Sequence, residues 1–93
     1  MVAVVARYTL LEGKAGEFSE IVKELVSKTR EEKGCILYEC CKSNDDPLKF
    51  IMMEKWESKE HIDAHIESAH FKELVPKMRA LLAERTVELY SPL

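Results

Sequence analysis

Two kinds of hydrophobic spacing follow one another along the first third of this chain. Residues 2–10 are mostly apolar and β-branched, which is typical of a buried strand. From Phe18 to Thr29 the apolar side chains recur at steps of three and four residues, with charged residues in the gaps. This period predicts an amphipathic helix with one buried stripe, and Gly34 follows as a residue that favours the end of a helix.

The middle of the chain predicts an antiparallel hairpin. Residues 35–42 and 48–57 have the composition of strands, and a cluster of turn-forming residues at 43–47 separates them. Because the connection is this short, the two strands are expected to lie side by side in one sheet.

The last third of the chain predicts a helix in two pieces and a final strand. Apolar residues at helical spacing predict a short helix at about 58–67 and a second helical segment at about 71–83. The spacing slips between the two pieces, and Pro76 is expected to kink the second one. Residues 85–90 alternate like a strand.

The predicted order of elements, β-α-β-β-α-β, is that of the ferredoxin-like α+β fold, with helices on one face of an antiparallel sheet. No linker interrupts it, so residues 1–93 are expected to form a single domain. The strands at 2–10 and 48–57 are apolar at both parities, which predicts that both faces of the sheet are covered. A second copy of the sheet is the simplest cover for the face without helices, so we expect a homodimer.

Charge and cysteine usage exclude several classes of partner. The net charge is −3 and no basic stripe is present, which argues against nucleic acid. No apolar run approaches the roughly 20 residues that span a bilayer, so no membrane segment is expected. The cysteines are odd in number, and Cys40 and Cys41 are adjacent in a predicted strand. A disulfide framework is therefore not expected, and we expect a cytoplasmic location.

The strand at 48–57 carries a carboxylate among apolar side chains. Strand alternation places Met52, Glu54 and Trp56 on one face. In an apolar pocket the pKa of Glu54 would rise, and the residue could act as a general base or acid near neutral pH. The alternative is that Glu54 forms an ion pair with a basic residue of a neighbouring strand, either Arg7 or Arg85.

All three histidines follow that strand within fifteen residues of the only tryptophan. His65 borders the apolar stripe of the first helical piece, and His70 lies at the bend, so either could face Trp56 and transfer protons. The alternative for each is a partly buried, hydrogen-bonded histidine, and His61 is expected to face solvent. His61 and His65 have the spacing of a helical metal pair, but no third ligand is evident, so no metal is expected.

The residues that carry this chemistry also resemble a known family. Three segments match the antibiotic biosynthesis monooxygenase (ABM) domain family: the Glu-x-Trp strand end with its following Ser, the Ala-His helix and the Ala-His-Phe bend. They lie at 54–60, 63–65 and 68–72, and Gly34-Cys35 with Tyr38-Glu39 resembles the second strand of the family. The resemblance covers nearly the whole chain and implies a dimeric α+β barrel, in which the sheets of two subunits pack face to face.

The resemblance implies that the protein is a monooxygenase that oxidises a small aromatic molecule, such as a quinol or a hydroxylated polyketide, with dioxygen and without any cofactor. In that chemistry a base deprotonates the substrate, and the anion passes an electron to dioxygen inside a dry aromatic slot. We expect three candidate catalytic residues: His65, His70 and Glu54. The candidate substrate contacts are Trp56, Tyr38, Phe71 and Met52.

Other activities in the same family remain as alternatives. Haem degradation is disfavoured, because Ala6 and Val75 occupy the positions where haem-degrading members carry an asparagine and a histidine. An isomerase of a phosphorylated signalling sugar would need a basic phosphate site. A non-catalytic ligand-binding or stress-response module would use the same cavity without turnover. The cheapest way to separate these readings is to ask whether His65 and His70 point into one enclosed cavity with Trp56. If both histidines face solvent, the enzymatic readings lose support and the binding module gains it.

Overall fold

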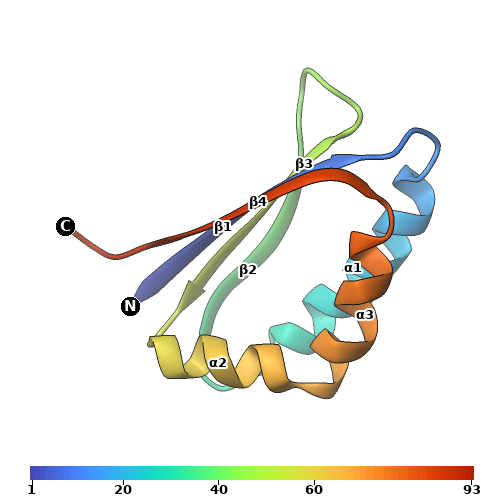
Figure 1. Ribbon diagram of the computed structural model, residues 1–93. Helices are drawn as coiled ribbons and strands as arrows, with labels where there is room; N and C mark the ends of the chain where they lie inside the picture. The colour runs from blue at the N-terminus through green and yellow to red at the C-terminus, as the bar shows by residue number, and fades with distance from the viewer.

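The computed structural model describes all 93 residues as a four-stranded antiparallel sheet with three helices on one face (Figure 1). The strands are β1 (Val2–Leu10), β2 (Cys35–Lys42), β3 (Lys49–Trp56) and β4 (Leu82–Tyr90). The helices are α1 (Ala15–Thr29), α2 (Lys59–Glu67) and α3 (Ala69–Arg79). The strand order is β2-β3-β1-β4, and the ferredoxin-like α+β prediction is confirmed.

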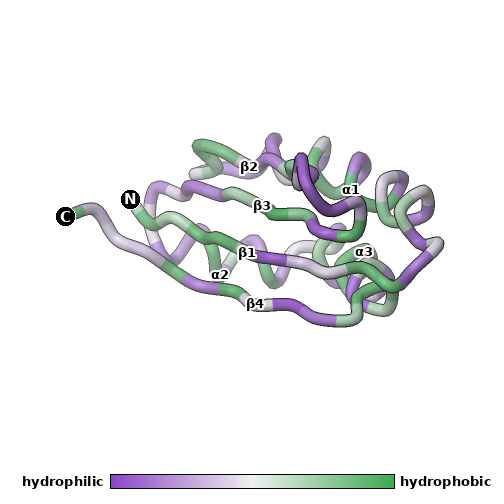
Figure 2. The backbone as a smooth tube through the Cα atoms, turned by 90° about the horizontal axis from the view of Figure 1, so that it is seen from above, coloured by the Kyte–Doolittle hydropathy of each residue, from purple (hydrophilic) through white to green (hydrophobic).

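The register of the sheet decides which side chains face the helices. On β1, Val4, Ala6 and Tyr8 are buried and alternate with less buried residues that point the other way. Val4 pairs with Glu54 on β3 and with Leu89 on β4. The helix-facing side therefore continues from β3 across β1 to β4, and Figure 2 shows these strands side by side in front of the helices.

The apolar stripe of α1 fills one end of the core. Phe18 is fully buried, and its ring lies 6.1 Å from the ring of Tyr8 and 4.9 Å from that of Phe50. Leu25 and Val22 continue the stripe toward α3, where Leu74 and Met78 are buried in turn. Burial of these side chains is the main favourable contribution to folding, at about 25 cal/mol per Å² of apolar surface.

The boundary between α3 and β4 differs from the prediction. The helical segment was expected to run to about residue 83, but α3 ends at Arg79 and β4 begins at Leu82. Leu82 pairs with Leu10 of β1, and the Leu11 N–H donates to the Leu81 carbonyl. Leu81 and Leu82 fit both a helical stripe and a buried strand end, so periodicity alone placed them in the wrong element.

The start of α3 is set by a cap that joins it to α2. Ser68 has an extended backbone, its hydroxyl accepts from the Phe71 N–H, and the same hydroxyl donates to the His65 carbonyl. Ser68 is the single non-helical residue between α2 and α3, and the chain changes direction there. His65 and His70 therefore point in different directions. None of the helices is long and apolar enough to cross a membrane.

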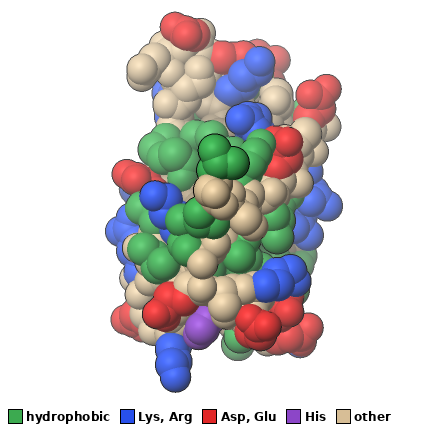
Figure 3. Space-filling view, turned by 90° about the vertical axis from the view of Figure 1, so that its left-hand side faces the viewer, with side chains coloured by type: hydrophobic (Ala, Val, Ile, Leu, Met, Phe, Trp, Pro, Cys, Tyr) green, Lys and Arg blue, Asp and Glu red, His purple; other side chains and the backbone are tan.

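The two faces of the sheet are covered unequally. The helices lie over β1, β2 and β3, whereas Val87 and Leu89 of β4 keep 46% and 49% of their surface exposed on the helix side. On the opposite face, Val5, Ile51 and Met53 are half-buried with no element over them. Figure 3 shows hydrophobic side chains gathered at the centre of this view, with charged groups around them.

Candidate active site

A small cavity of about 120 Å³ lies between the sheet and the pair α2 and α3. Its wall is mostly apolar, and all four strands and all three helices contribute to it. Five of its lining residues carry a polar or charged group: Tyr8, Tyr38, Glu54, His65 and Arg79. A mostly apolar cavity with a few convergent polar groups is the usual form of a small-molecule site.

The inner end of the cavity is built around the imidazole of His65. This side chain is 3% exposed, and its ring centroid lies 4.8 Å from that of Trp56, which is completely buried. The rings of Tyr38 and Phe71 lie 5.4 Å and 5.0 Å away, both edge-on to the imidazole. Burial among these rings lowers the pKa of His65, although the hydrogen bond to Glu32 opposes the shift.

Glu32 holds both His65 and His70. Its Oε2 atom lies 2.5 Å from His65 Nδ1 and 2.7 Å from His70 Nε2. The residue sits in the turn after α1, where its N–H donates to the Thr29 carbonyl. An imidazole that donates from Nδ1 to a carboxylate keeps its Nε2 lone pair free, so Glu32 sets the tautomer of His65.

His70 lies on the far side of Glu32 from the cavity. It does not line the cavity, and it opens instead on a surface groove shared with Lys28, Glu31 and Glu73. The rings of His65 and His70 are 6.0 Å apart. Of the two histidines only His65 therefore lines the cavity, and His70 lies outside it with 15% of its side-chain surface exposed.

Glu54 is the second titratable group of the cavity. Its Oε1 atom accepts from the indole N–H of Trp56 at 2.9 Å. Burial raises the pKa of Glu54 to about 7, while the hydrogen bond from Trp56 acts in the opposite direction. The alternative of an ion pair with Arg7 or Arg85 is wrong, because Arg7 binds Glu88 on the other face and Arg85 forms no ion pair.

His61 differs from its expected placement. It is half-buried instead of facing solvent, and its Nδ1 atom lies 2.7 Å from the Ser58 hydroxyl. Its ring also packs against Gly34, where a side chain in place of the hydrogen would overlap the imidazole. Gly34 has φ +85°, so the turn before β2 requires glycine both for its backbone and for this contact.

The only group with the makings of a metal site is formed by Glu32, His65 and His70, whose ligand atoms lie within 4.8 Å of one another. Two ligands at about 2.1 Å from a tetrahedral ion stand about 3.4 Å apart. The carboxylate oxygen is much closer than that to each imidazole nitrogen, at hydrogen-bond distance. The observed arrangement fits a hydrogen-bonded triad, and a metal ion would have to displace Glu32 from both rings.

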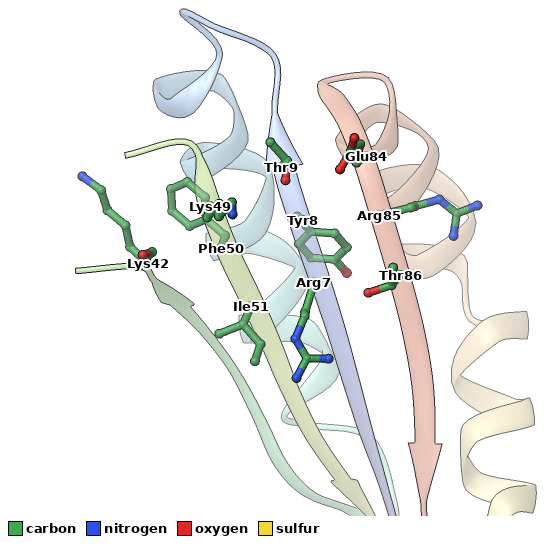
Figure 4. A pocket seen from close by; sticks show the side chains of 11 residues that line it. Arg7, Tyr8, Thr9, Lys42, Lys49, Phe50, Ile51, Glu84, Arg85 and Thr86 are labelled. Atoms are coloured by element: carbon green, nitrogen blue, oxygen red, sulfur yellow. The ribbon is translucent and has the colours of Figure 1, made fainter. Parts of the chain in front are cut away.

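A larger hollow of about 390 Å³ lies on the opposite face of the sheet (Figure 4). Five of its eleven lining residues are charged: Arg7, Lys42, Lys49, Glu84 and Arg85. None of the residues predicted for catalysis or substrate contact lines it. The titratable groups with shifted pKa values and aromatic neighbours therefore gather in the smaller cavity, which we treat as the candidate active site.

Comparison with known proteins identifies the family and agrees with the fold. The sequence model of the family described as "Antibiotic biosynthesis monooxygenase" matches residues 1–77. This chain belongs to that family. A solved structure described as an antibiotic biosynthesis monooxygenase superposes with a TM-score of 0.95 and 30% identity, over 100% of this chain and 99% of the other.

Two curated relatives match this chain over a smaller part of their length. The Bacillus subtilis protein named "Putative monooxygenase YcnE" is 33% identical over 70 residues, which are 75% of this chain and 74% of YcnE. The Synechocystis protein named "Uncharacterized protein sll1783" is 30% identical over 71 residues, or 76% of this chain. The matched region spans only 48% of that relative's length.

Within this ABM chain the expected site residues fall into two groups. His65, Glu54, Tyr38 and Phe71 line the cavity. The others do not: His70 lies behind Glu32, while Trp56 and Met52 are fully buried in the core beside the cavity. The sequence analysis missed Glu32 altogether, because its partners are 33 and 38 residues away and its neighbours Arg30, Glu31 and Lys33 look like an ordinary charged turn.

Proposed function

We propose that this ABM protein is a cofactor-independent monooxygenase that oxidises a small phenolic or quinolic ring with dioxygen. One observation carries the proposal: His65 lines a mostly apolar cavity with its Nδ1 edge fixed by Glu32. A neutral imidazole in that tautomer presents Nε2 as a base, and its lowered pKa keeps it unprotonated at neutral pH. The family match and the relative named as a monooxygenase support the reaction class.

The first step is removal of a proton. A substrate phenol in the cavity donates its O–H proton to His65 Nε2, and the carboxylate of Glu32 stabilises the resulting imidazolium through Nδ1–H. The ring anion then passes one electron to dioxygen, and the two radicals combine to form a carbon–oxygen bond. The peroxide oxygen takes the proton back from His65.

The second step releases water. His65 removes the hydrogen from the peroxide-bearing carbon, the O–O bond breaks, and the departing hydroxide takes that proton. One oxygen atom stays on the ring as a carbonyl and the other leaves as water. All four electrons that reduce dioxygen come from the substrate, so the balance needs no external reductant. Imidazole acts twice as a base and twice as an acid.

Glu54 is placed to stabilise charge on oxygen. Its Oε1 atom is engaged by Trp56, which leaves Oε2 as the atom that carries the proton. With a pKa of about 7, a large fraction of Glu54 is protonated at neutral pH and can donate a hydrogen bond to a phenolate or peroxide oxygen. Trp56 therefore acts as a positioning residue for Glu54.

Oxygen uptake in the presence of single-ring phenols and quinols tests the proposal, with uncatalysed autoxidation subtracted. We expect enzyme-dependent uptake, and we expect His65→Gln to lower it by about 100-fold, as is usual for loss of a general base. The control is His61→Gln, because His61 lies one helical turn away and binds Ser58 outside the cavity. Saturable binding without uptake would favour a non-catalytic ligand-binding module.

We also infer that two copies associate through the face of the sheet that carries no helix. Val5, Ile51 and Met53 are half-buried on that face. Figure 3 shows hydrophobic side chains at the centre of its view, with charged side chains around them. An apolar patch ringed by polar groups is typical of an interface between subunits. Sedimentation should show a dimer that Met53→Lys converts to a folded monomer. A monomeric wild type would rule out this interface.

A further inference from the structure

Two arginines stand at the outer rim of the candidate active site without an acidic partner. Arg79 of α3 lines the cavity, and its guanidinium carbon lies 5.9 Å from the centre of the Phe71 ring. Arg85 of β4 is paired across the sheet with Tyr8, another residue of the cavity wall. Neither arginine takes part in an ion pair, whereas Arg7 on the opposite face binds Glu88.

The two cations are close enough to influence one another. The charge of Arg85 contributes, after burial, to a lowering of the Arg79 pKa. Both arginines also oppose the rise in pKa that burial and Glu54 impose on the Tyr8 hydroxyl. Like charges that approach one another near an apolar wall are unfavourable unless an anion joins them. The rim therefore carries positive charge that no acidic side chain neutralises.

The shape of the cavity agrees with a ligand that reaches this rim. Its volume of about 120 Å³ is that of a site for one ring, since an engineered cavity of about 150 Å³ holds one benzene molecule. The wall is open beside β4, where Val87 and Leu89 line the cavity and remain half exposed. A substituent on the bound ring would leave by that opening and meet Arg79.

Figure 4 shows the orientation of Arg85 relative to the outer hollow. Arg85 is one of the residues that line this hollow, and in this view its side chain extends from β4 away from Arg7. Because Arg85 is paired with Tyr8, whose side chain faces the helices, the side chain of Arg85 leaves β4 on the same side of the sheet as Arg79. The opposite end of the cavity already has its polar groups engaged, since Glu32 binds two imidazoles and Glu54 binds the indole.

We propose that the substrate is an aromatic oxyanion: one ring lies beside His65 and Glu54, and a carboxylate or phosphate on a short arm binds Arg79 and Arg85 at the β4 opening. The planar guanidinium matches both oxyanions through paired N–H donors. This assignment deepens the proposed function, but its test measures binding and does not depend on turnover.

Trp56, the only tryptophan, provides the readout because it is buried beside the cavity. Fluorescence titrations at low salt would compare 4-methylphenol with 4-hydroxyphenylacetate, and phenol with phenyl phosphate. We expect the wild type to bind at least one of the two anions about tenfold more tightly than its neutral counterpart, with the preference falling as salt is added. Whichever anion shows the larger preference identifies the substituent class.

The variants locate the effect. Arg79→Met should remove most of the preference for the anion and leave the affinity for the neutral ring within about twofold, and Arg85→Met should remove less. Lys77→Met is the matched control, because Lys77 is an exposed cation of the same helix that lies near Glu73. Arg79→Lys, which keeps the charge, should retain part of the preference if Arg79→Met proves unstable.

Equal affinity of the wild type for both members of each pair, no binding of any probe, or an unchanged preference in Arg79→Met would overturn the inference. The two proposals fail separately. Anion preference without oxygen uptake would contradict the monooxygenase while leaving the arginine site in place. Turnover of neutral phenols with no charge preference would do the reverse.

Discussion

The two ends of the cavity differ in how far their polar groups are satisfied. At the inner end, Glu32 and His65 form one hydrogen bond of 2.5 Å, and Trp56 donates another of 2.9 Å to Glu54. Three aromatic rings surround the imidazole. At the outer end, beside β4, the arginines have no partner and apolar side chains remain exposed.

This difference separates two tasks within one small site. Hydrogen bonds and tight packing at the inner end fix the tautomer and position of a base, which is what proton transfer requires. The arginines at the outer end have no partner in the protein, so a ligand can supply one. Substitutions at the inner end should therefore change stability and chemistry, whereas those at the outer end should change mainly binding.

The largest contrast should appear in stability. Trp56→Ala removes a fully buried ring and leaves Glu54 without its hydrogen-bond donor, so we expect a loss of about 3–5 kcal/mol. Leu89→Ala, at the open side of the same cavity, should cost less than about 1 kcal/mol. Urea unfolding of both variants measures the difference. Similar losses would show that the outer end is as tightly packed as the inner end.

The next contrast concerns pH. The pKa of Glu54 is raised to about 7 in the folded protein and is ordinary when unfolded, so the unfolded chain releases this proton first as pH rises. Glu54 should therefore reduce stability progressively between about pH 4.5 and 7, by on the order of 2–3 kcal/mol. Glu54→Gln should remove that decline while keeping an acceptor for Trp56.

Urea unfolding of Glu54→Gln and wild type at about pH 5 and about pH 8 tests this sign. The stability of Glu54→Gln relative to the wild type should increase as pH rises. His65 acts in the opposite sense: its pKa is lowered in the folded protein, so its contribution to stability is lost as pH falls below its unfolded value. If the stability of Glu54→Gln changed with pH in the same way as that of the wild type, Glu54 would be solvated and its pKa would not be raised by burial.

A smaller effect, on turnover, should distinguish Glu32 from the adjacent Glu31. Glu32→Gln keeps the shape but removes the charge that stabilises imidazolium, so we expect turnover to fall about tenfold, a loss of about 1.4 kcal/mol. The pH at which activity is half-maximal should also shift. Glu31→Gln, one residue away on the outer groove, is the control. Equal rates for the two variants would remove Glu32 from the mechanism.

The smallest effect is expected far from both ends. Arg7→Met breaks the exposed pair with Glu88 on the opposite face of the sheet, and such pairs contribute at most about 1 kcal/mol. Stability and ligand affinity should both change little. A large change in affinity would mean that the outer face of the sheet communicates with the cavity.

The sequence predicts the fold well because its signals are local. Strand alternation places Glu54 between Met52 and Trp56, and the helical stripes identify the buried side of each helix. The exception is Leu82, whose place in β4 depends on its pairing with Leu10, a contact between the two halves of the chain. Periodicity within one segment contains no information about that contact.

The site is less accessible from sequence for the same reason. His65 is recognisable from its position on the stripe and from the family resemblance, but its partner Glu32 lies in a turn that precedes it by 33 residues. The roles of His65 and His70 differ only because the Ser68 cap changes the direction of the chain between them. Arg79 likewise becomes notable only once the fold shows that no acid approaches it.

Nitrogen-15 NMR of the imidazoles tests the central claim most directly, since it reports which nitrogen of His65 carries the proton. At neutral pH the account predicts that Nδ1 is protonated and Nε2 is bare in the free protein, and that the Nε2 signal shifts when a phenol binds and donates a hydrogen bond to it. A proton on Nε2 in the free protein, or a His65 signal that a bound phenol leaves unchanged, would contradict it.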